Sequence, residues 1–230
     1  MEPVIALLGL IAIAGAVYWL AQANKKDRQR MADILGLAVL EKGAQESGKN
    51  STMGHFHQTL AMCGEMHGHA AGVWVRSVRR LSSRHSRSGS MQSVLAFDLK
   101  VPSAVAFRIE PAMTGKLQSW FGGDQPVLPS GDAEFDKFFR FTSQDAGVAT
   151  KILTPETRAL LLAFRQGVVG KMPDSALGRF SGDLLMGTFA VEGARATYAV
   201  SGTPSEKIAR HFEMAARFLA EFSQRVRETL

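Results

Sequence analysis

The feature of this sequence that most limits its possible folds is an uncharged apolar run near its start. Between Pro3 and Ala23 there is no charged side chain, and the run VIALLGLIAIAGAVYWL is apolar apart from its glycines and one tyrosine. A helix needs about 20 such residues to cross a bilayer core of about 30 Å. Tyr18 and Trp19 stand at the far end, where amphipathic rings settle at the headgroup level. We therefore expect residues 1–23 to form a transmembrane helix.

The charges that follow this run predict its orientation. Four cations come directly after it, and they are Lys25, Lys26, Arg28 and Arg30. Because positive charge is retained on the cytoplasmic side, we expect a single-pass membrane protein with its N-terminus outside and its main domain in the cytoplasm. The alternative is a cleaved signal peptide ending at Ala21-Gln22-Ala23, but such a peptide carries its cations before the apolar core.

Small residues within the run indicate a possible helix–helix contact. Gly9, Ala12 and Ala16 lie three and four residues apart, so they form one stripe where another membrane helix could approach closely. Gly and Ala are also common in membrane helices in general, and this alternative stays open. The first interpretation makes other subunits of a membrane complex the expected partners.

The positive charge of the chain is local. The formal net charge is +6, and a second basic segment, VRSVRRLSSRHSRSGS, holds arginines and no acid. Its serine and glycine content predicts a long loop from Leu81 to Ser90. This loop could bind anionic lipid headgroups, nucleic acid or an acidic protein surface, or it could simply be solvated. Lipid is favoured over nucleic acid, because the loop lacks the groove-fitting helices and interleaved aromatic residues that read nucleic acid. Its arginines are Arg76, Arg79, Arg80, Arg84 and Arg87.

The rest of the chain has the pattern of an α+β domain with an antiparallel sheet and packed helices. Segments that are rich in β-branched residues and alternate apolar with polar or small positions predict strands at 70–78, 93–101 and 104–110. A hairpin is expected to turn at Gly193. The segment EFDKFFRFT at 134–142 is so rich in phenylalanine that a core is expected beneath it.

Three further helices are predicted from periodicity and capping. The first continues from the basic segment and is expected to end near Gly43, before a linker. The second begins at Thr154 and Pro155 and ends at Gly167. The third, at the C-terminus, is long: Thr203 opens a capping box, and an apolar stripe at positions 208, 212, 215, 219, 222 and 226 is expected to pack on the sheet. The expected domains are a transmembrane helix at 1–23, a basic juxtamembrane helix and linker at 24–52, and a cytoplasmic α+β domain at 53–230.

One segment carries a resemblance to known sequences. The residues concerned are Phe135, Asp136, Phe138 or Phe139, Leu153, Thr154, Pro155, Arg158, Leu161 and Leu162. Their spacing resembles that of a broad group of uncharacterised bacterial membrane-anchored proteins, in which an F-D-x-x-F strand is followed by a short helix and an L-T-P-x-x-R-x-x-L-L helix. The resemblance implies a shared fold and a shared anchor, and it makes the bacterial inner (cytoplasmic) membrane the expected location. It implies no activity, because the group offers no catalytic residues to carry over.

A metal site is the clearest chemical candidate. Residues 53–70 hold four of the six histidines and the one cysteine of the chain, together with three methionines. Copper accepts such a mixed ligand set, whereas a structural zinc site needs several cysteines or a tight Cys/His set. We favour the alternative that the histidines decorate the start of a strand, because their spacing matches no metal motif. The candidate ligands are His55, His57, Cys63, His67 and His69.

Other chemistry finds little support in the sequence. There is no P-loop and no G-x-G-x-x-G, so we expect no nucleotide and no other cofactor. Cys63 lacks the surrounding signature of a nucleophile. The acids Asp132, Glu134 and Asp136 are spaced like the start of a calcium loop, but the glycine and the final carboxylate of such a loop are missing.

These observations together predict a non-enzymatic accessory or structural subunit of a larger membrane complex, for which we expect an energy-transducing host, respiratory or photosynthetic. Two alternatives stay open. One is a copper-type metal-binding protein that uses the cluster at 53–69. The other is a protein that binds anionic lipid or nucleic acid through the arginine and serine loop.

Overall fold

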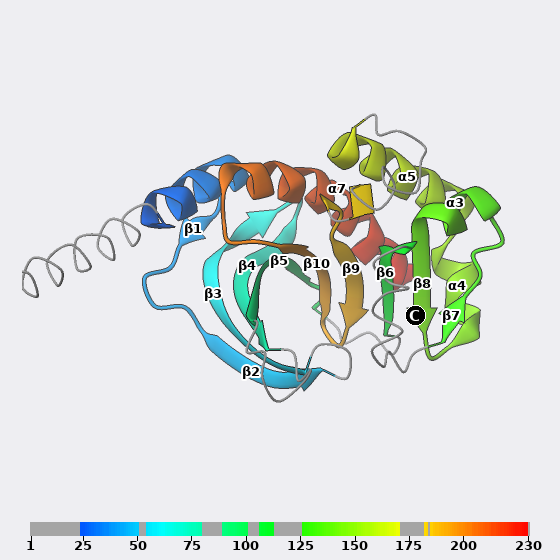
Figure 1. The fold of residues 1–230 in the computed structure, drawn as a ribbon, viewed down its shortest axis with the longest axis horizontal. Helices are drawn as coiled ribbons and strands as arrows, with labels where there is room; N and C mark the ends of the chain where they lie inside the picture. Colours follow the sequence, from blue (N-terminus) through cyan, green and yellow to red (C-terminus); the bar gives the residue numbers. More distant parts are fainter. Residues whose placement is uncertain are drawn as a thin grey trace, which may run out of the picture.

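The fold is built on one sheet of ten antiparallel strands (Figure 1). The computed structural model describes residues 24–50, 54–79, 89–100, 106–112, 126–170, 182–183 and 185–229. The strands are β1 (Ala38–Val39), β2 (Gln45–Asn50), β3 (Gly54–Met66), β4 (His69–Arg79), β5 (Gly89–Asp98), β6 (Phe107–Pro111), β7 (Val127–Leu128), β8 (Phe139–Ser143), β9 (Thr188–Glu192) and β10 (Arg195–Ser201). Their order in the sheet is β1-β3-β4-β5-β10-β9-β6-β8-β7, and β2 pairs with β3 beside β1.

The helices gather on one face of this sheet. They are α3 (Ala133–Phe138), α4 (Ala146–Ile152), α5 (Pro155–Val169) and α7 (Glu206–Thr229), with a further helix over residues 24–35. Figure 1 shows α5 and α7 along the upper side of the strands. The buried apolar residues of all five helices belong to one core cluster, which they share with the inward residues of the strands. An antiparallel sheet with packed helices, including one over 24–35, α5 and α7, is therefore present as predicted, with bounds that differ in part.

The C-terminal helix α7 uses its apolar stripe as predicted. Its residues at 208, 212, 215, 219 and 222 are all buried in the main core, and the side chain at 226 lies outside the described residues. The helix packs on β10 and β5 and against α5. Its cap differs from the prediction, because the Ser205 hydroxyl, not Thr203, accepts the hydrogen bond from the backbone N–H of Ile208.

The helix α5 begins where the sequence predicts and ends slightly later. The Thr154 side chain accepts from the backbone N–H of Thr157, and Pro155 occupies the first turn, where its missing N–H costs no hydrogen bond. The helix passes Gly167 and is capped by Gly170, whose φ of 68° is the left-handed conformation that glycine adopts without strain.

The structure corrects the predicted membrane helix. Within the described residues no helix is long and apolar enough to cross a membrane. The longest, α7, is amphipathic, with charged residues on the side away from its apolar stripe. The predicted span at 1–23, with Gly9, Ala12, Ala16, Tyr18 and Trp19, lies outside the described residues. The expected fold class, with a transmembrane helix anchoring the domain, and the single-pass inner-membrane location with the N-terminus outside are therefore not supported.

Residues that were expected to form a helix and a linker have another structure. The helix over 24–35 ends at Gly36, whose φ is 66°, seven residues earlier than predicted, and its Met31 and Ala32 are fully buried in the main core. The expected linker contains β2, which pairs with β3. The sequence of β2, QESGKN, has no apolar alternation, so its strand structure comes from the long edge of β3 rather than from its own pattern. The division of the chain into a segment at 24–52 and a separate domain at 53–230 stays a prediction.

The F-D-x-x-F segment is a helix, not a strand. The Asp132 side chain accepts hydrogen bonds from the backbone N–H groups of Glu134 and Phe135, and this cap starts α3. The strand β8 begins only at Phe139. The three acids at 132, 134 and 136 therefore do not share the face of a strand.

A β-bulge in β3 changes which side chains point to which face. The register between β3 and β4 shifts between Leu60 and Met62. Leu60 therefore faces away from the helices, whereas Met62 is fully buried in the main core, although two residues in a regular strand point the same way.

Tyr198 stands at the centre of the main core. It is fully buried, and its ring lies 4.6 Å from that of Phe189. Its hydroxyl accepts a 3.1 Å hydrogen bond from the backbone N–H of Gly187, and burial raises the pKa of that hydroxyl. A side chain at Gly187 would collide with the Tyr198 ring, so glycine is required there.

We expect Tyr198→Phe to lower the free energy of unfolding by about 1–3 kcal/mol, because the Gly187 N–H loses its acceptor in a buried site. Urea denaturation measures the loss, and hydrogen exchange at the Gly187 amide should become faster. An unchanged exchange rate at Gly187 would contradict the prediction.

Candidate functional site

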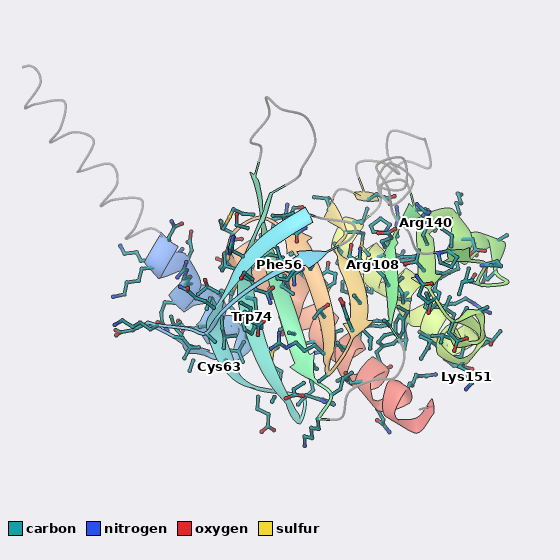
Figure 2. The ribbon with its side chains drawn as sticks, turned by 90° about the horizontal axis from the view of Figure 1, so that it is seen from below. Phe56, Cys63, Trp74, Arg108, Arg140 and Lys151 are labelled. Carbon is teal, nitrogen blue, oxygen red and sulfur yellow. The ribbon has the colours of Figure 1, made fainter. Side chains whose placement is uncertain are left out.

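The face of the sheet opposite the helices, called the open face below, carries a second and smaller apolar cluster. It consists of Trp74, Val94 and Ala96, all buried, together with Leu60 and Ala199, which are partly buried. These residues lie on β3, β4, β5 and β10, and Trp74 is 6 % exposed. Figure 2 views the molecule from the side of the open face and labels Trp74 there. Since the packed helices belong to the other core, something else must cover this cluster.

The cover of Trp74 is an ion pair. The guanidinium of Arg195 lies 4.9 Å from the centre of the Trp74 ring. Both of its terminal nitrogens donate 2.8 Å hydrogen bonds to the two carboxylate oxygens of Glu46. The pair joins β10 to β2, although β3, β4 and β5 lie between these strands in the sheet. Figure 1 shows the reason: the strands curl, so that β2 lies on the side of the sheet away from α7.

The ion pair continues into a chain of hydrogen bonds. The Gln58 amide nitrogen donates to Glu46 at 2.7 Å, and its amide oxygen accepts from Nε of Arg76 at 2.8 Å. The Arg76 guanidinium lies 5.0 Å from the centre of the Phe56 ring. Hydrogen bonding from Arg195 holds the pKa of Glu46 below its ordinary value. Four strands thus contribute to one polar layer above the apolar cluster.

More charges converge on this layer from the other half of the sheet. Burial lowers the pKa of Arg76, and the positive charge of Arg108 on β6 lowers it further. The carboxylates of Glu192 on β9 and Glu46 act in the opposite direction. Arg108 is half-buried. In the view of Figure 2, the label of Arg108 lies between those of Phe56 and Arg140.

Glu110 is the most deeply buried acid of this region. It lies on β6 directly opposite Arg140 on β8, and it is 7 % exposed. Burial raises the pKa of Glu110, against the effect of Arg108 and Arg140. Within the described part of the chain, the buried Nη1 atom of Arg140 has no hydrogen-bond partner. A carboxyl group with a raised pKa therefore lies among the arginines.

The structure separates the candidate metal ligands. His67 and Gly68 form the two-residue turn of the β3–β4 hairpin, with φ angles of 51° and 77°. His69 is buried and stacks on Phe97 at 5.4 Å. His57, which is exposed, lies near the opposite end of β3, and the half-buried Cys63 lies between. The backbone of His55 pairs with that of Arg79, and its side chain is not described. No group of three or more potential ligands in the described residues could hold a metal ion.

The predicted basic residues are in part outside the described structure. Arg80, Arg84 and Arg87 lie there, and only the backbone of Arg79 is described, at the end of β4. Exposed positions on the helix over 24–35 are occupied by Lys25, Lys26, Arg28 and Arg30. No described contact joins these four helix residues to the polar layer. The charged and polar members of that layer are Glu46, Gln58, Arg76, Arg108, Glu192 and Arg195, and of these only Arg76 drew attention in the sequence.

Comparison with known proteins gives a fold and no family. No protein-family model matches the sequence, and no curated protein sequence matches it either. The architecture, a large antiparallel sheet with helices on one face, is similar to that of a solved structure, the mycobacterial trehalose monomycolate transport factor TtfA. The TM-score is 0.52 at 14% sequence identity, over 89% of this chain and 94% of that chain. This similarity shows a shared fold alone, and the expectation of a single-pass subunit of a membrane complex gains no support from it.

We expect Glu46→Ala to lower the free energy of unfolding by about 1 kcal/mol at pH 7, because it removes one partner each from Arg195 and Gln58 in a half-exposed pair. The matched control is Glu206→Ala, which breaks an exposed Glu206–Arg210 pair of similar length on α7 and should cost less than about 0.5 kcal/mol. Urea denaturation compares the two, and equal losses would contradict a structural role of the polar layer.

The raised pKa of Glu110 gives a prediction with a definite sign. The folded state holds this proton more tightly than the unfolded state, so stability falls as the pH rises through the range between the ordinary and the raised pKa. Glu110→Gln removes this loss. We expect the variant to gain stability over the wild type between pH 4 and pH 7, measured by urea denaturation across that range. A gain that is the same at both pH values would contradict it.

Proposed function

We propose that this protein is a non-enzymatic accessory factor that acts by binding a partner protein, and that the open face is its binding surface. The observation that carries the proposal is the convergence of Trp74, Arg195, Arg76 and Arg108 on one curled, helix-free surface. Tryptophan and arginine are the residues that most often dominate the energy of protein interfaces. Arginine side chains packed on aromatic rings also allow both apolar and polar contacts.

The similarity in fold agrees with an accessory role. The protein of similar structure is, by its name, a factor for the transport of trehalose monomycolate. A role as a factor in a transport process is the corresponding suggestion for this chain. It requires no catalytic group, and the described histidines and the cysteine are distributed over β3, the β3–β4 turn, β4 and α7.

Site-specific photo-crosslinking tests the proposal. A photoreactive phenylalanine analogue replaces Phe56, which is half-buried on the open face, in the full tagged chain expressed in its own cells. The matched control carries the same analogue at Leu160, an exposed position of α5 on the other side of the molecule.

We expect a discrete partner to be crosslinked from position 56 and not from position 160, as judged by mass spectrometry of the purified adducts. Crosslinking from position 160 alone would contradict the proposal, and so would recovery of the unmodified monomer from both.

A further inference from the structure

The carboxylate of Glu46 lies in a set of hydrogen-bond donors that other strands supply. Its two oxygens accept 2.8 Å hydrogen bonds from both terminal nitrogens of Arg195 and a 2.7 Å hydrogen bond from the Gln58 amide nitrogen. The Arg195 guanidinium lies over the Trp74 ring. Arg195, Gln58 and Trp74 belong to β10, β3 and β4, whereas Glu46 belongs to β2. These strands therefore build a site for a carboxylate, with a planar guanidinium that binds it end-on.

The strand that carries Glu46 is held by backbone pairing and by this ion pair, not by apolar packing. The sequence of β2, QESGKN, has no apolar side chain to bury, and among the described strands β2 pairs with β3 alone. The side chains of the pair are 44% exposed for Arg195 and 37% exposed for Glu46. Ion pairs of such exposure contribute little free energy. A carboxylate from outside can therefore reach the same donors and compete with Glu46.

Two acids beside the site limit the kind of anion that it can take. Arg195 lies directly opposite Asp98 on β5 and Glu192 on β9, and directly opposite residues of neighbouring strands share one face of the sheet. A polyanion such as nucleic acid would meet these carboxylates next to the arginine, and the like charges would repel. A single carboxylate carries one charge and matches the donors, as the three hydrogen bonds of Glu46 demonstrate.

We infer that Glu46 is an internal occupant of a site at which Arg195 and Gln58 bind a carboxylate of an acidic segment of the partner protein. The inference rests on the proposed function, because it names the chemistry by which the open face recognises its partner. In the free protein Glu46 fills the site. In the complex the partner's carboxylate accepts the three hydrogen bonds, and β2 loses its side-chain link to β10.

A titration of the full chain tests the inference. The probe is a capped peptide of alternating glycine and glutamate, and NMR follows its binding through the side-chain N–H signals of Arg195 and the indole N–H signal of Trp74. The comparison probes are the matched glycine–glutamine peptide, inorganic phosphate and a single-stranded DNA oligonucleotide. We expect saturable shifts of both signals with the glutamate peptide and none with the glutamine peptide.

Removal of Glu46 gives the result that is specific to this inference. Glu46→Ala empties the site, so the glutamate peptide should bind this variant about fivefold more tightly than the wild type, as for the loss of a competing exposed ion pair. The matched control is Glu206→Ala, which frees the exposed Arg210 on α7 and should leave binding unchanged.

A second substitution locates the binding at Arg195. In the Glu46→Ala background, Arg195→Lys keeps the charge but loses the planar pair of donors, and it should reverse the gain in affinity. Thermal unfolding confirms that each variant folds. If Glu46→Ala does not fold, Glu46→Gln replaces it, since this variant removes the charge that competes with the peptide and should also bind the peptide more tightly.

The outcomes separate this inference from the proposed function. Affinity for the glutamate peptide that Glu46→Ala fails to raise, an equal gain from Glu206→Ala, or equal or tighter binding of the glutamine peptide, phosphate or DNA would overturn the carboxylate site. If position 56 still crosslinks to a partner in that case, the proposed function stands. If the peptide binds at Arg195 but position 56 yields no crosslink, the site stands and the proposed protein partner is rejected.

Discussion

The burial of α7 against one face of the sheet is the interaction on which the rest of the structure depends. Phe212, Leu219 and Phe222 enter the same core as Tyr198 and Phe189, and each is at most 2 % exposed. Because this burial uses one face only, the sheet is left with two faces of different character. One is a conventional apolar core beneath helices. The other face has no helices on it, so the curvature of the sheet and polar side chains must cover its apolar residues.

Curvature and charge solve that problem together. The curl brings β2 across the open face, and the two hydrogen bonds between Arg195 and Glu46 hold it there above Trp74. An exposed ion pair contributes little free energy, so another charged group can replace one of its members more easily than a packed helix can be displaced. The surface that protects the small cluster is therefore also the surface that we propose for partner binding.

The sequence predicts local structure better than it predicts the site. The apolar stripe of α7, the Thr154 cap and the strands predicted at 70–78 and 93–101 follow from short-range patterns. The structure has the stripe and the cap, and its strands β4 and β5 overlap the predicted ones, although β5 ends at Asp98. The polar layer does not follow, because Glu46 and Arg195 are 149 positions apart and meet only through the curl. Two elements also escape the local pattern. Pairing with β3 makes QESGKN a strand although it has no apolar alternation, and the Asp132 cap starts a helix where the resemblance implies a strand. Of the histidines that were candidate metal ligands, His67 lies in the turn of the β3–β4 hairpin and His69 is a buried residue of β4.

The bulge in β3 has a consequence for how this fold tolerates change in length. Ahead of Ala61 the even-numbered positions of the strand, such as Gln58 and Leu60, face outward, and beyond it Met62 faces the core. Removing Ala61 would place Leu60 next to Met62, so the strand would alternate regularly while each of these two residues kept the face that it has now. Loss of the codon for Ala61 would therefore leave both faces of the hairpin unchanged, whereas loss of one codon elsewhere in β3 would turn the residues on one side of the gap to the opposite face.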